Sequence, residues 1–265
     1  MSTEYAPRGF IGMLTPQANT AVEPESAILL PAGVGLLAGR LVSARPTIEE
    51  RLVDYFDTLD ASAAQFGSAP LGALGFACTG ASYLAGRARE DEVFGRLSQR
   101  LGCTVTSSAL AVVDALHALD ARDIALVSPY SDSLTTQSVG YWESRGFAVR
   151  AVAKVAAAAS SNAHPIYGLG SEAATQALAG LRGQGHDAVV LLGTGMPTLR
   201  AILATPQMNG APVFSCTLAL AWRCTRALEG ADCSAASLLD WISGRGWKER
   251  LQARTAPARM ESNRN

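Results

Sequence analysis

Short apolar runs alternate with amphipathic or more polar stretches along most of the chain. The apolar runs have the length and continuity of strands that are covered on both faces, and they lie at 9–15, 34–43, 71–78, 123–128, 147–155, 187–193 and 211–216. The stretches between them predict helices at 47–66, 88–101, 107–119, 131–145, 170–183 and 217–229. This alternation predicts parallel sheets with helices on both faces.

The number of strands is too large for one small sheet, so two α/β lobes are the natural division. A chain of 265 residues is long enough for each lobe to bury a core of its own. The halves also share a rhythm of strand, small-residue turn and helix, at 71–82 and again at 187–200. We therefore expect an α/β protein with two similar lobes.

Composition narrows the class of partner. Apolar residues make up 48% of the chain, and 22 basic residues balance 23 acidic ones. This balance provides no electrostatic reason to expect nucleic acid or an anionic membrane surface as a partner. No apolar run approaches the ~20 residues of a membrane span, and the first residues lack the pattern of a secretory signal. We expect a cytoplasmic protein, whose five cysteines are free thiols.

Ligands of parallel sheets bind beyond the carboxyl ends of the strands, so the turns that follow the strands are the candidate sites. In the first such turn, residues 15–25 (T-P-Q-A-N-T-A-V-E-P-E), Asn19 can donate and accept hydrogen bonds to a ligand. The alternative is that Asn19 only caps a turn.

The second turn, residues 77–82, has the sequence A-C-T-G-A-S. Thr79 and Gly80 predict exposed backbone N–H groups that bind carboxylate or phosphate oxygens. The same N–H groups would lower the pKa of the Cys78 thiol and favour the reactive thiolate. The alternative is a buried structural cysteine.

Two further turns follow strands of the second half. In S-P-Y-S-D-S-L, residues 128–134, the hydroxyl of Tyr130 can point into a cleft; the alternative is an interface aromatic beside a helix cap. In L-L-G-T-G-M-P-T-L, residues 191–199, a dinucleotide loop would need glycine at position 198, where Thr198 stands. This turn can instead present backbone N–H groups to an anion, from Gly193, Thr194 and Gly195.

The three histidines show no metal-ligand spacing, so no metal is expected. His164 lies beside Asn162 in the polar segment S-S-N-A-H-P, where both can line a cleft. No G-x-S-x-G signature of a serine hydrolase is present.

Taken together, the four turns resemble those of the aspartate/glutamate racemase superfamily, in its maleate isomerase and arylmalonate decarboxylase branch. G-M-L-T-P-Q-A-N-T-A-V-E-P-E resembles the opening motif, with Asn19 as a substrate-binding asparagine. A-C-T-G-A-S resembles the first cysteine motif, S-P-Y-S-D-S-L the tyrosine motif, and V-V-L-L-G-T-G-M-P-T-L the second cysteine motif. Asn162 matches a second binding asparagine.

The resemblance implies two pseudo-symmetric Rossmann-like lobes with the active site between them, no cofactor, and a homodimer or larger homo-oligomer. A small mono- or dicarboxylate would be held by Asn19, Thr79, Gly80, Asn162, Gly193, Thr194 and Gly195. It also implies that residues 211–230 return to the first lobe, so that the lobes comprise 1–106 plus 211–265 and 107–210.

The chain departs from the resemblance at Gly193, which stands where the second cysteine is expected. Racemisation needs an acid and a base on opposite faces of the substrate, and a single thiol supplies one of them. The first prediction is therefore a maleate cis-trans isomerase-like enzyme, in which the Cys78 thiolate adds to the double bond and Tyr130 exchanges the proton.

Three alternatives remain open. An arylmalonate-type decarboxylase would use Cys78 as proton donor, with protonation from the face opposite to that used when the second motif carries the cysteine. An aspartate, glutamate or hydantoin-type racemase would need a second group, such as Thr194 or His164. A non-catalytic dicarboxylate-binding protein would use the same anion-binding cleft.

Overall fold

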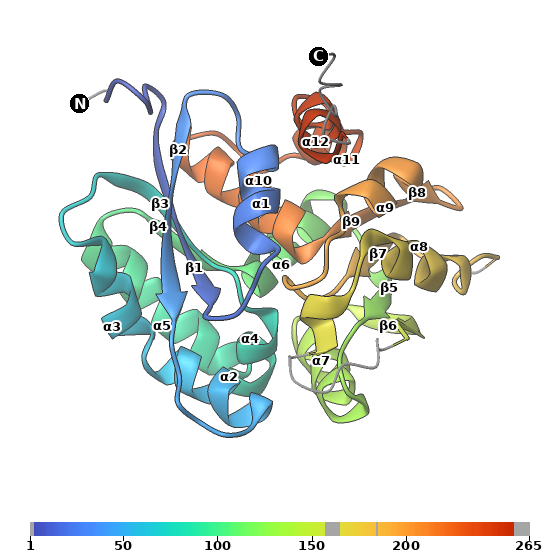
Figure 1. The fold of residues 1–265 in the computed structure, drawn as a ribbon. Helices are drawn as coiled ribbons and strands as arrows, with labels where there is room; N and C mark the ends of the chain where they lie inside the picture. Colours follow the sequence, from blue (N-terminus) through green and yellow to red (C-terminus); the bar gives the residue numbers. More distant parts are fainter. Residues whose placement is uncertain (1–2, 157–164, 184, 257–265) are drawn as a thin grey trace, which may run out of the picture.

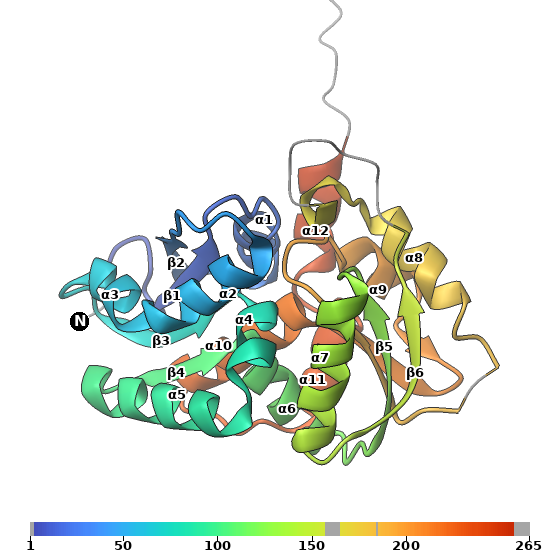
Figure 2. The same ribbon diagram turned by 90° about the horizontal axis from the view of Figure 1, so that it is seen from below.

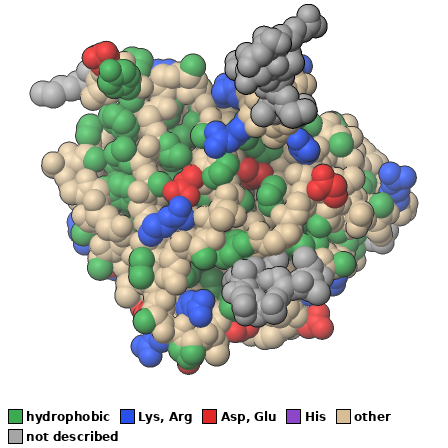
Figure 3. Space-filling view, viewed as in Figure 1, with side chains coloured by type: hydrophobic (Ala, Val, Ile, Leu, Met, Phe, Trp, Pro, Cys, Tyr) green, Lys and Arg blue, Asp and Glu red, His purple; other side chains and the backbone are tan. Residues whose placement is uncertain are grey.

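The structure, a computed structural model, describes residues 3–156, 165–183 and 185–256. Figure 1 shows two α/β lobes side by side, each built on its own sheet. The predicted α/β class with parallel sheets is confirmed. In the described part of the chain, no helix combines the length and the apolar character that crossing a membrane would require. Figure 3 shows basic and acidic side chains interspersed on the face seen in Figure 1.

The first sheet has four parallel strands in the order β2-β1-β3-β4. The strands are β1 (Gly9–Pro16), β2 (Val34–Leu41), β3 (Leu71–Phe76) and β4 (Thr104–Ser107). The helices of this half are α1 (Val22–Leu29), α2 (Ile48–Asp57), α3 (Leu59–Ala63), α4 (Thr79–Ala85) and α5 (Arg87–Leu101), and a 3₁₀ turn spans Ala64–Phe66.

The second sheet has five strands in the order β6-β5-β7-β9-β8, of which only the short β8 is antiparallel. The strands are β5 (Asp123–Ser128), β6 (Ala148–Lys154), β7 (Ala188–Leu191), β8 (Gln207–Met208) and β9 (Ala211–Ser215). The helices that follow β4 in the chain are α6 (Ser108–Ala118), α7 (Asp132–Ser144), α8 (Ser171–Ala179), α9 (Leu199–Ala204), α10 (Cys216–Leu228), α11 (Ala235–Ile242) and α12 (Lys248–Thr255), with a 3₁₀ turn at Pro165–Gly168.

The strands form where the chain is apolar enough to be buried on both faces. The last six residues of β1 and all four of β7 are buried, because helices cover both sides of each sheet. Helix α2 begins at a capping box, in which the Thr47 hydroxyl accepts from the backbone N–H of Glu50 while the Glu50 carboxylate accepts from that of Thr47. This box holds the first turn of α2, which faces the site.

The segment after residue 210 links the two lobes. Strand β9 pairs with β7 in the second sheet, so the expectation that 211–230 returns as a unit to the first lobe is wrong for the strand. Helix α10 then crosses to the first lobe, where it packs along α6 and against β3, β4, β1 and α1. The chain thus changes lobe at Ser215, the N-cap of α10, because β9 satisfies its backbone in one sheet while α10 buries its apolar residues mainly against the other.

A buried ionic cluster joins the lobes where α5 meets α7. Figure 2 shows α4, just before α5, lying against α7 of the second lobe. The Glu90 side chain is fully buried and forms an ion pair of 2.6 Å with Arg145, which is also buried. Ser107 and Tyr141 donate hydrogen bonds to the two Glu90 oxygens, and Arg145 also pairs with Asp91.

A second buried carboxyl, that of Glu25, joins α1 to the turn before α9. Its Oε1 accepts from the backbone N–H groups of Thr198 at 2.6 Å and Leu199 at 3.2 Å. Burial raises the pKa of Glu25 and the hydrogen bonds lower it. The effect of burial is larger, so the pKa is raised to about 7. Glu25 is therefore a titrating contact between the lobes.

We expect this contact to make stability depend on pH. The Glu25 pKa is about 7 in the folded protein against 4.5 ordinarily, so its stabilising contribution is full below pH 4.5 and is lost as the pH rises to about 7. Glu25→Gln keeps the acceptor oxygen without titrating. The stability of the wild type relative to this variant should fall by up to about 3 kcal/mol across that range. Urea unfolding at a series of pH values measures it, and a difference that does not change with pH would contradict the expectation.

Candidate active site

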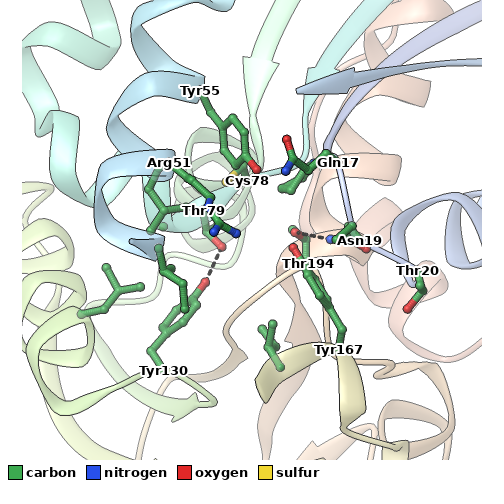
Figure 4. Close-up of a pocket in the computed structure, with 18 of the residues that line it drawn as sticks. Gln17, Asn19, Thr20, Arg51, Tyr55, Cys78, Thr79, Tyr130, Tyr167 and Thr194 are labelled. Atoms are coloured by element: carbon green, nitrogen blue, oxygen red, sulfur yellow. Dashed lines mark hydrogen bonds between the residues drawn. The ribbon is translucent and has the colours of Figure 1, made fainter. Parts of the chain in front are cut away.

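All four predicted turns meet at one cavity between the lobes. They follow the carboxyl ends of β1 and β3 in the first sheet and of β5 and β7 in the second. The cavity has a volume of about 490 Å³, and Figure 4 shows how its main side chains face one another. It is lined by Pro16, Gln17, Ala18, Asn19, Thr20, Ile48, Arg51, Leu52, Tyr55, Cys78, Thr79, Gly80, Tyr130, Leu134, Ile166, Tyr167, Gly168, Thr194 and Gly195.

Cys78 lies two residues after β3, at the N-cap of α4. Cys78 is 4% exposed, and the backbone N–H of Ala81 donates a hydrogen bond to its thiol. Burial outweighs this hydrogen bond and raises the pKa of the Cys78 thiol to about 12. The predicted lowering of the thiol pKa is therefore wrong. Burial in apolar surroundings destabilises the thiolate more than the N-terminus of the seven-residue helix α4 stabilises it.

Position, and not acidity, distinguishes Cys78 from the other buried cysteines. Burial also raises the thiol pKa of Cys216 and Cys224 to about 12. Neither of these two residues lines the cavity, whereas Cys78 does. The Cys216 thiol lies behind the cavity wall, where the backbone N–H of Gly193 and the hydroxyl of Thr79 bind it.

Asn19 combines the two roles that the sequence left open. Its Oδ1 accepts from the backbone N–H groups of Ala21 at 2.9 Å and Val22 at 3.1 Å, so it caps the start of α1. Its Nδ2 donates to the Thr194 hydroxyl at 3.4 Å, at the cavity wall. Because the oxygen is occupied by the helix, Asn19 faces a ligand as a hydrogen-bond donor.

The hydroxyls of Thr79 and Tyr130 meet across the lobes at 2.8 Å. Burial raises the pKa of Tyr130 well above its ordinary value, so its phenol is a neutral donor or acceptor at physiological pH. Ser131, not Tyr130, serves the next helix, because its hydroxyl caps α7 by accepting from Leu134. Tyr130 is thus free of a capping role and lines the cavity.

The last turn presents Thr194 and Gly195 to the cavity, whereas Gly193 does not line it. Gly193 has a φ of +84°, and an added Cβ there would lie 2.7 Å from Ile166 and 2.9 Å from Pro129. A side chain at this position would therefore be strained and crowded. Thr194 donates to the carbonyl oxygen of Ala77 at 2.8 Å, which places the Thr194 hydroxyl next to the Cys78 backbone.

Several lining residues escaped the sequence analysis. The most prominent are Gln17, Arg51, Tyr55 and Tyr167. The backbone N–H of Gln17 donates to the Tyr55 hydroxyl, which places this phenol against the turn after β1. The helical spacing of 48, 51, 52 and 55, one face of α2, was the available signal. Tyr167 lies two residues after S-S-N-A-H-P, a segment in which only Asn162 and His164 were given predicted roles.

Two predicted residues, Asn162 and His164, lie outside the described residues. Within the described ranges, no group of three or more histidine, cysteine or acidic side chains is placed to hold a metal ion. Gly193, also predicted to bind the substrate, does not line the cavity, whereas the other predicted residues all do: Asn19, Cys78, Thr79, Gly80, Tyr130, Thr194 and Gly195.

Comparison with known proteins agrees with this arrangement. A maleate isomerase of Pseudomonas putida is 28% identical over 236 residues, which cover 83% of this chain and 91% of that protein. The crystal structure of a maleate isomerase variant from Pseudomonas putida S16 with maleate superposes with a TM-score of 0.77 at 23% identity, covering 89% of this chain and 98% of the other.

The fold is also shared with a Nocardia farcinica maleate cis-trans isomerase mutant that carries a covalently bound succinylcysteine intermediate. The two structures superpose with a TM-score of 0.72 at 24% sequence identity, and the match covers 88% of this chain and 98% of the Nocardia chain. The sequence model of the arylmalonate decarboxylase family matches residues 11–238, which include all four turns of the cavity. The chain therefore belongs to the arylmalonate decarboxylase family.

Proposed function

We propose that the protein is a cofactor-independent isomerase that converts a cis-enedioate such as maleate into its trans isomer, with Cys78 as the nucleophile. The observation that carries the proposal is the placement of the Cys78 thiol in a cavity whose other described lining residues include no second thiol. The relationship to the maleate isomerases supports the choice of substrate.

In the first step the Cys78 thiol gives its proton to solvent water, from which it is recovered in the last step, and its sulfur forms a bond to one alkene carbon. The electron pair of the double bond moves to the neighbouring carbon, where its carboxylate shares the charge. The remaining bond is single and rotates. The electron pair then re-forms the double bond, the carbon–sulfur bond breaks, and the thiol recovers its proton. Atoms balance, and no oxidant or reductant is needed.

The cavity residues hold the carboxylates while the central bond turns. Asn19 presents its Nδ2, and Gly195 and Gly80 present backbone at the wall. The Tyr130 hydroxyl, paired with Thr79, is the donor that exchanges a proton with the carbanion. Asn162 remains a predicted binding residue.

The geometry disfavours an amino-acid racemase. The second motif contributes the Thr194 hydroxyl, which already donates to the Ala77 carbonyl. A threonine hydroxyl is a far weaker base than a thiolate, so the pair of opposed bases that racemisation needs is not assembled from the described residues.

One observation favours a second candidate, an arylmalonate-type decarboxylase. A thiol with a pKa of about 12 stays protonated at neutral pH and so suits a proton donor. Loss of carbon dioxide from a malonate leaves an enediolate, which Cys78 would protonate on carbon. The apolar side chains of Ile48, Leu52 and Leu134 at the cavity wall would accommodate an aryl group.

Proton NMR in heavy water tests the two candidates together. The protein is incubated separately with maleate, a methyl-arylmalonate, and aspartate or glutamate. We expect the alkene signal of fumarate from maleate. Decarboxylated acid in place of fumarate would transfer the assignment to the second candidate, α-deuteration would indicate a racemase, and unchanged spectra with bound maleate would indicate a binding protein.

We expect the rate of isomerisation to rise with pH. Because the Cys78 pKa is about 12, the thiolate fraction in the empty site increases about tenfold per pH unit between pH 7 and 10. The value of kcat/KM for maleate should rise in parallel, with circular dichroism confirming that the protein stays folded. A plateau that begins below pH 9 would show instead that a group of the site removes the proton during the attack.

A cytoplasmic location and a homodimeric or larger assembly remain predictions. Sedimentation of the purified protein measures the second.

A further inference from the structure

Arg51 brings a cation to the cavity, on the exposed first turns of α2. Ile48, Arg51, Leu52 and Tyr55 form one face of this helix, and all four line the cavity. Building on the proposed function, we propose that Arg51 is a specificity-determining residue that binds one carboxylate of the substrate and selects substrates with two carboxylates over those with one.

The guanidinium is held in place before any ligand arrives. Its Nε donates to the carbonyl of Arg45 at 2.6 Å, and its Nη2 donates to that of Pro46 at 3.0 Å. The capping box of Thr47 and Glu50 fixes the same turn. These bonds occupy one edge of the planar group, so the Nη1 edge keeps its donors for a ligand at little further cost in side-chain entropy.

No carboxylate of the described residues neutralises the charge of Arg51. Among the described residues, Arg51 forms no ion pair, and none of those that line the cavity is acidic. Arg40, another arginine near the turn after β1, instead forms an ion pair with Glu23. Burial raises the pKa values of Tyr55 and Tyr167, and the charge of Arg51 opposes this rise in both, so its field reaches the cavity. An anionic ligand would supply the missing counter-charge.

Arg51 lies on the opposite side of Cys78 from Asn19. Figure 4 shows Arg51 and Tyr55 projecting from α2 on one side of Cys78, and Asn19 with Thr194 on the other. A substrate whose double bond lies at the Cys78 thiol can therefore place one carboxylate toward Asn19 and the other toward Arg51. A guanidinium–carboxylate contact is charge-assisted, so it discriminates against a neutral group of the same shape.

Equilibrium binding tests this role without requiring turnover. Maleate and maleamate, in which an amide replaces one carboxylate, are titrated calorimetrically into Cys78→Ala and into Cys78→Ala with Arg51→Gln. We expect Cys78→Ala to prefer maleate by about tenfold or more, and Arg51→Gln to weaken maleate binding by about ten- to a hundredfold and maleamate binding by less than about threefold. Arg51→Lys should retain part of the preference, because it keeps the charge without the planar fork.

Arg89→Gln is the matched control, because Arg89 pairs with Asp57 at the other end of α2, away from the cavity. It should leave both affinities unchanged. Equal loss of both ligands in Arg51→Gln would indicate a merely structural role and overturn the inference, as would the absence of a maleate preference in Cys78→Ala. The outcome is separate from the proposed function. If Arg51→Gln weakens maleate binding selectively but the wild type does not convert maleate, the isomerase proposal is wrong and the role of Arg51 stands.

Discussion

Replacement of Cys78 by alanine is expected to reduce maleate isomerisation by at least about a thousandfold, because it removes the atom that forms the covalent bond. The fold should persist, since the substitution deletes one buried sulfur atom between β3 and α4. Fumarate formation, followed by absorbance or NMR, measures the activity, and circular dichroism confirms the fold. Cys78→Ser should be similarly inactive, because a serine hydroxyl is a much weaker nucleophile than a thiolate.

Cys224→Ala is the matched control for this experiment. Cys224 is also buried, its thiol pKa is likewise raised to about 12, and it lies on α10 outside the lining of the cavity. We expect its activity to stay within a few-fold of the wild type. Residual activity of Cys78→Ala near the wild-type level, or an equal loss in Cys224→Ala, would remove Cys78 from the chemistry.

The largest effect on stability is expected from Arg145→Met. Without the Arg145 guanidinium, the partners left to the fully buried Glu90 carboxylate among the described residues are the hydroxyls of Ser107 and Tyr141. An uncompensated buried charge of this kind costs about 3–5 kcal/mol. The lost stability should appear as a lower midpoint of urea unfolding. Because α5 and α7 belong to different lobes, the contact between the lobes should also be weaker.

Two variants separate this charge effect from a general loss of packing. Arg150→Met breaks an exposed pair with Asp123 and should cost no more than about 1 kcal/mol. Adding Glu90→Gln to Arg145→Met removes the stranded charge and should restore part of the lost stability. A double variant less stable than Arg145→Met alone would show that the unpaired charge is not the cause.

Much of the fold could be predicted from apolar periodicity. The runs at 123–128 and 211–216 correspond closely to β5 and β9, because strands buried on both faces need continuous apolar sequence. Strand β4 was missed because its four residues, T-V-T-S, are mostly polar and are specified by pairing with β3. Helix α4 was missed as a full helix because its start, T-G-A-S, has turn-like composition.

The candidate site was predictable to the extent that it lies on strand ends. Parallel strands place their carboxyl ends at one edge, so the turns bearing Asn19, Cys78, Tyr130 and Thr194 could be grouped from sequence. Arg51 and Tyr55 could not be added, because they come from a helix face whose orientation depends on packing between α2 and α4.

The sequence by itself determined the α/β class, the cavity-lining turns and the presence of one thiol among them, because these follow from local patterns. Tertiary structure decided the rest. It placed β9 in the second sheet, brought Arg51 to the cavity, and raised the Cys78 pKa where the local N–H groups predicted a lower one. Desolvation and net charge in a cavity depend on residues remote in the chain, and only the folded arrangement of both lobes sets them.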